Sequence, residues 1–110
     1  MSAREIKFSP VERPYIVLVD DNFHYMDEEY RFCAGSFWTA GEAVSFCQAI
    51  VDEYLASALQ EGMNAEQLLA SYRMFGEDPF IIGARQGRLF SAWDYAELRC
   101  RELCSESNSS

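Results

Sequence analysis

The clearest hydrophobic pattern in the chain is a helical one over residues 40–61. Apolar side chains recur there every three or four positions, which is the period of an amphipathic helix. Thr39 precedes the stretch and Glu42 follows three residues later, a pair that predicts a capping box, and Gly62 predicts the helix end. The apolar rows are formed by Ala43, Cys47, Ile50, Tyr54 and Ala58 and by Val44, Val51, Leu55 and Leu59.

Two further helices are predicted from similar signals. Asn64 and Gln67 form a second capping box, and the helix that follows runs to about Phe75, where Gly76 stops it. Ser91 is the expected cap of a last helix, whose apolar face contains Ala92, Ala96, Cys100 and Leu103.

Strands are predicted in the segments between the helices. Residues 15–19 are β-branched or apolar and run on to residue 26, and residues 30–38 form a second strand after a polar turn, so the two make a hairpin with a bulge at Gly35. Residues 77–79 read as a connector before a third strand at 80–84. A turn at 85–88 leads to a short fourth strand at Leu89 and Phe90.

The predicted order is therefore ββααββα, an α+β fold. Two hairpins with helices packed on one face give a two-layer sandwich with an antiparallel sheet, and the hairpins join either within the chain or across a dimer interface. We expect residues 1–13 to be a flexible arm, residues 14–104 to be a single domain and residues 105–110 to be a disordered tail.

Composition and charge narrow the possible functions. The 110 residues include 18 Asp and Glu but 9 Lys and Arg, a net charge of −9, which argues against nucleic-acid binding. The sequence lacks a run of about 20 apolar residues and an apolar signal-peptide core, so we expect a cytoplasmic protein that does not bind membranes. Cys33, Cys47, Cys100 and Cys104 are interpreted as reduced packing thiols, and no cofactor is expected.

The acidic residues concentrate in the first hairpin. Five of the 18 lie in residues 20–29, without a Lys or Arg among them. Strand alternation would place Asp20, Asn22 and His24 on one face. Together with Cys33, these three residues could form a small-ligand or metal site. We do not assign a metal site. If a metal is bound, Asp20 and His24 are the expected ligands. The other interpretations are a solvated hairpin tip and a protein-binding tip.

The leading hypothesis is a non-enzymatic, cytosolic protein-interaction module that uses this acidic, aromatic-rich hairpin, either in a homodimer or against a basic partner. His24 is the only histidine, and no G-x-S-x-G elbow accompanies it, which argues against catalysis. The alternatives are a divalent-metal or small-ligand binding domain, including a minor enzyme, and an acidic mimic of nucleic acid. The candidate binding residues are Asp20, Asp21, Asn22, His24, Tyr25, Asp27, Glu28 and Trp93.

Three stretches carry a resemblance to other proteins. They are residues 19–28 (VDDNFHYMDE), 75–80 (FGEDPF) and 90–96 (FSAWDYA). Together they resemble a family of small uncharacterised bacterial proteins. The resemblance implies a bacterial cytosolic protein, and it supplies no activity, ligand or catalytic residue.

Overall fold

The structure is a computed structural model that describes residues 13–24, 28–83 and 89–108. Within these residues the strands and helices follow the order ββααβα, so the chain is an α+β protein, as predicted. The elements are β1 (Tyr15–Asp21), the 3-10 turns η1 (Asn22–His24) and η2 (Glu28–Tyr30), β2 (Phe32–Phe37), α2 (Ala40–Ala58), α3 (Ala65–Phe75), β3 (Glu77–Ile82) and α4 (Ala92–Asn108).

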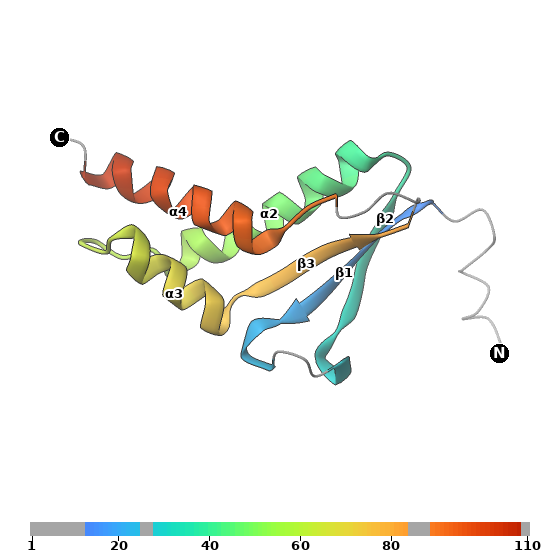
Figure 1. Cartoon of the computed structure of the whole chain (residues 1–110), viewed down its shortest axis with the longest axis horizontal. Helices are drawn as coiled ribbons and strands as arrows, with labels where there is room; N and C mark the ends of the chain where they lie inside the picture. The colour runs from blue at the N-terminus through green and yellow to red at the C-terminus, as the bar shows by residue number, and fades with distance from the viewer. Residues whose placement is uncertain (1–12, 25–27, 84–88, 109–110) are drawn as a thin grey trace.

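The described strands form one antiparallel sheet in the order β2-β1-β3 (Figure 1). The predicted first hairpin is confirmed, because β1 pairs with β2. The register shifts between Val17, which pairs with Gly35, and Leu18, so the predicted bulge is also confirmed. The strands are shorter than expected, since β1 ends at Asp21 and a 3-10 turn replaces its extension.

The predicted second hairpin is wrong. β3 begins at Glu77 rather than Phe80, and it pairs with β1 instead of a fourth strand. Leu89 and Phe90 are not in a strand, and the Phe90 side chain packs against both hydrophobic cores. The predicted turn at 85–88 lies outside the described residues.

The start of β3 shows why the connector prediction failed. A proline keeps the preceding residue out of the helical region, and that restriction is compatible with an extended strand. Pro79 pairs with Val19 and is fully buried. Because β3 is an edge strand of the described sheet, the missing N–H of a proline is tolerated there.

The long helix α2 contributes to two hydrophobic cores. Its N-terminal half packs on the sheet, where Ala43 and Cys47 meet Val17 and Val19. Its C-terminal half packs with α3 and α4, which extend past the end of the sheet (Figure 1). The buried residues of this second core are Val51, Leu55, Leu68, Tyr72, Ala92, Ala96, Cys100 and Cys104.

Both predicted capping boxes are confirmed. The side chain of Thr39 accepts a hydrogen bond from the backbone N–H of Glu42 at 3.1 Å, and that of Asn64 accepts from the N–H of Gln67 at 2.8 Å. The Glu42 and Gln67 side chains bond back to the cap residues. These reciprocal bonds satisfy backbone donors that have no partner inside the helix.

Two helix ends differ from the prediction. α2 ends at Ala58, and Gly62, with a φ of 85°, lies in the turn beyond it. α4 continues to Asn108, so residues 105–108 of the predicted disordered tail are helical. Residues 1–12 of the predicted arm lie outside the described residues. None of the described helices is both long enough and apolar enough to span a membrane.

Candidate functional site

Four rings gather where β1 and α3 end. Phe23 stacks on Phe75 with the ring centroids 5.7 Å apart, and His24 stacks on Tyr30 at 3.7 Å. The Phe23 and His24 rings meet edge to face at 4.9 Å, which joins the two stacks. Phe23, Phe75 and Tyr30 are 60%, 56% and 45% exposed, so these large rings are ordered against one another without being buried. We call these four residues the aromatic tip.

Asn22 fixes the aromatic tip to the helices. Its side chain is buried, and its Nδ2 donates a hydrogen bond to the backbone oxygen of Tyr72 at 2.9 Å. Its backbone N–H donates to the carbonyl of Gly76 at 3.0 Å. Both acceptors belong to the C-terminal end of α3, so Asn22 holds Phe23 beside Phe75. The predicted ligand Asn22 is therefore buried against the end of α3.

Asn22→Ala is expected to lower the free energy of unfolding by about 1–2 kcal/mol, because it removes the buried hydrogen bond to Tyr72. Urea denaturation measures this loss. The control is Asp20→Asn, which weakens an ion pair with Arg31 near the surface and should cost below about 1 kcal/mol. If the control costs as much as Asn22→Ala, the anchoring role assigned to Asn22 is wrong.

The two carboxylates at the end of β1 have separate partners. Asp20 accepts hydrogen bonds from Arg31 at 2.7 and 3.1 Å. Asp21 lies 3.0 Å from Nδ1 of His24 and accepts the backbone N–H of Phe23 at 2.9 Å. The hydrogen bond with His24 is the main cause that holds the pKa of Asp21 below its ordinary value. Asp21 therefore orients one ring of the aromatic tip.

A corner rich in negative charge lies beside the aromatic tip. Glu77, the first residue of β3, pairs in register with Asp21. Partial burial raises the pKa of Glu77, and the charges of Asp21 and of Glu53 on α2 raise it further. We call Asp21, Glu53 and Glu77 the acidic corner.

Glu77→Gln is expected to stabilise the protein at pH 7. The raised pKa of Glu77 means that its ionised form costs stability in the folded state, and that cost disappears as the pH falls and the carboxyl takes up a proton. The gain should stay below about 1 kcal/mol, because the side chain is exposed enough for solvent to screen the repulsion. Urea denaturation at pH 7 and at pH 4 tests this. A gain that is larger at pH 4 would contradict it.

The structure does not bring the predicted ligand set together. The 3-10 turn η1 breaks the strand alternation, so Asn22 turns inward while His24 joins the aromatic tip and Asp20 pairs with Arg31. Cys33 lies exposed on β2. In the part of the chain that the structure describes, no group of three His, Cys, Asp or Glu side chains is placed to hold a metal ion.

The other predicted binding residues lie elsewhere or are not described. Trp93 lies on α4 and packs against α3, with its ring 6.3 Å from that of Tyr72 and the Arg73 guanidinium over it. Tyr25, Asp27 and the side chain of Glu28 lie outside the described residues. Trp93 therefore belongs with the helical core and not with the hairpin.

Three of the four cysteines are buried, as predicted, whereas Cys33 is exposed. Burial raises the pKa of the Cys47 thiol to about 12 and that of Cys100 to about 11. At neutral pH these two side chains stay protonated. Because the thiolate is the nucleophilic form of cysteine, they are packing residues and not nucleophiles.

Sequence reasoning missed Phe75 as a surface residue. It follows Tyr72 by three positions and Leu68 by seven, a spacing that predicts a place on the buried face of α3. The helix ends at Phe75, however, and its side chain meets only the exposed ring of Phe23 among the ring contacts of the described residues. No local signal marks this pairing.

The fold and the site define a small α+β protein with an exposed aromatic tip beside an acidic corner. Comparison of the chain with protein-family models, with curated proteins and with solved structures found no match. The contacts of the described residues are therefore the basis for the function proposed below.

Proposed function

We propose that the protein is a non-enzymatic protein-interaction module and that the aromatic tip is its binding surface. The observation that carries this proposal is the exposure of Phe23, Tyr30 and Phe75 in stacked pairs. Aromatic residues are enriched among the hot spots of protein interfaces. Side chains already held in stacks lose little rotamer freedom on binding, which favours affinity.

His24 is the only histidine of the chain, and it is held between the Asp21 carboxylate and the Tyr30 ring. Both contacts fix the orientation of the imidazole. The same contacts make His24 a rigid part of a surface.

The partner of the tip should present arginine side chains. The acidic corner lies beside the tip, and guanidinium groups combine ion pairing with stacking on aromatic rings. Ring contacts of this kind already occur inside the protein. Guanidinium groups lie over rings at 5.6 Å for Arg13 and Trp38, 5.2 Å for Arg31 and Phe80, and 5.7 Å for Arg73 and Trp93.

The test compares what the tagged protein captures from a cell lysate with what two variants capture. The double variant Phe23→Ala and Phe75→Ala removes one stack of the tip. The control Trp38→Ala removes a ring that is 58% exposed but contacts Arg13 instead of the tip. We expect the double variant to capture at least tenfold less of the partner than the wild type does, whereas the control should capture the same amount. High salt should reduce the amount that the wild type captures.

Light scattering in the same buffer decides whether the partner is a second copy. A dimer that the double variant dissociates would support the tip as a self-association surface. The proposal fails if the protein is a strict monomer that captures nothing, or if the double variant captures the same proteins as the wild type.

A further inference from the structure

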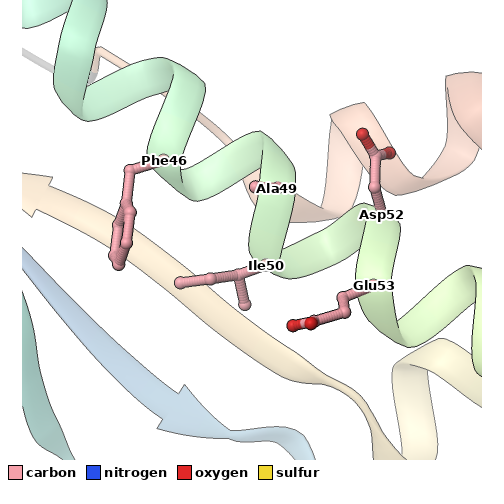
Figure 2. A pocket seen from close by; sticks show the side chains of 5 residues that line it. All are labelled: Phe46, Ala49, Ile50, Asp52 and Glu53. Atoms are coloured by element: carbon pink, nitrogen blue, oxygen red, sulfur yellow. The ribbon is translucent and has the colours of Figure 1, made fainter.

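A second surface lies on a flank of α2 that borders α4 at Asp52. A hollow of about 510 Å³ runs along this flank (Figure 2). Four of its residues are spaced at i, i+3, i+4 and i+7, which places them in one stripe down the helix. We call the hollow the α2 groove, and its lining residues are Phe46, Ala49, Ile50, Asp52 and Glu53.

The apolar side chains of the groove are held in place by packing against the core. Phe46 packs on Phe37 of β2 with the ring centroids 5.0 Å apart, and both Phe46 and Ile50 lie against the core beneath the sheet-facing half of α2. Ala49 is exposed between them and adds no bulk. Figure 2 shows Phe46 and Ile50 extending from the same side of the helix.

The lining of the groove favours a helical partner over a small molecule. A small-molecule site surrounds most of its ligand, whereas every residue that lines this groove comes from one helix. A stripe with apolar residues at i, i+3 and i+4 is the surface on which a second helix packs, with interaxial distances of about 8–10 Å.

The negative charge around the groove favours a positively charged partner. α2 contains Glu42, Asp52 and Glu53 but no Lys, Arg or His in its 19 residues. Asp52 already accepts hydrogen bonds from Tyr95 and Arg99 of α4. Glu53 has no ion-pair partner among the described residues, and it stands in the acidic corner at the end of the apolar stripe.

We propose that the α2 groove binds an amphipathic helix of another protein, with its apolar stripe on Phe46, Ala49 and Ile50 and with arginine or lysine residues at the end that meets Glu53. This site shares Glu53 with the acidic corner beside the aromatic tip, but its apolar residues lie on α2, and it does not depend on the function proposed for the tip. The recognition is that of a helix in a groove, in which apolar anchors supply affinity and the charged end sets the orientation.

The experiment titrates the full chain with a synthetic amphipathic helix that has leucines along one stripe and arginines at one end. A matched peptide carries glutamates in place of the arginines. Ala49→Arg places bulk and positive charge in the groove. The control Ala70→Arg makes the same change at an exposed alanine of α3, so both variants have the same net charge. We expect Ala49→Arg to weaken binding of the arginine peptide at least tenfold and Ala70→Arg to change it less than twofold.

A charge exchange gives a second readout that does not rely on bulk. Glu53→Arg should weaken binding of the arginine peptide and strengthen binding of the glutamate peptide. Backbone amide shifts during the titration should be largest along α2. The inference is overturned if the arginine peptide does not bind, if Ala49→Arg and Ala70→Arg have equal effects, or if the shifts map to the aromatic tip. A dimer that Ala49→Arg dissociates would overturn it in favour of a second copy.

Discussion

Gly83→Ala is expected to lower the free energy of unfolding by about 4 kcal/mol or more, an effect at the upper end for single substitutions. Gly83 directly follows β3 and has a φ of 120°, a conformation that residues with a side chain rarely adopt. A Cβ at this position would lie 1.9 Å from the carbonyl oxygen of Pro14 and 3.4 Å from the Cα of Tyr15. Both are backbone atoms at the start of β1, so no side-chain rotation relieves the overlap. β1 and β3 must separate at this end of the sheet.

Gly62→Ala is the matched control. Gly62 also has a positive φ, at 85°, but an added Cβ meets nothing within 4 Å. Its cost should therefore be the conformational penalty alone, about 1–2 kcal/mol. Urea denaturation followed by circular dichroism measures both variants. Equal losses for the two glycines would show that Gly83 does not lie as close to Pro14 as described.

Tyr72→Ala is expected to lower the free energy of unfolding by about 4 kcal/mol, because removal of a large buried aromatic ring leaves a cavity in the core. Tyr72 is fully buried, and its ring lies 5.9 Å from that of Tyr54 and 6.3 Å from that of Trp93. The ring also packs over Gly76, where an added Cβ would approach its Cδ1 to 2.4 Å. One side chain thus joins the helical core to the turn that starts β3.

Tyr72→Phe separates the ring from the hydroxyl. The hydroxyl donates a hydrogen bond to the backbone oxygen of Glu77, and its loss should cost about 1 kcal/mol. Thermal and urea denaturation compare the two variants. If Tyr72→Ala costs no more than Tyr72→Phe, the ring does not fill the core as described.

The pH dependence offers an independent check on Tyr72. Burial is the main cause that raises its pKa above the ordinary value, and nearby Asp78 adds to the effect. The unfolded chain ionises its tyrosines from about pH 10, so the folded state loses stability as the pH rises above that value. Tyr72→Phe lacks this contribution and should lose less stability between pH 9 and pH 11, as urea denaturation at the two values would show.

The helices were largely predictable because their signals are local. The capping boxes at Thr39 and Asn64 involve residues three apart, and the same short spacing sets the bonds in the structure. The first hairpin was predictable for a similar reason, since its strands lie close together in the chain. The sequence also located the acidic stretch, residues 20–29, that contributes Phe23 and His24 to the aromatic tip.

The composition of the candidate site was not predictable from the sequence. Regular strand alternation would have placed Asn22 and His24 on one face, but η1 turns Asn22 inward to the end of α3 and leaves His24 in the tip. Phe75 reaches the tip from a distant part of the chain. Its helical spacing predicts burial, and only the position of α3 against η1 leaves its ring at the surface.

The sequence by itself determined the α+β class, the helices with their caps and the first hairpin, because short-range hydrogen bonding and hydrophobic periodicity control those features. The tertiary structure alone decided that β3 pairs with β1, that Phe90 enters the cores and that Phe23 and Phe75 stay exposed. Strand pairing and burial depend on contacts between segments far apart in the chain, and local residue spacing carries no information about those contacts.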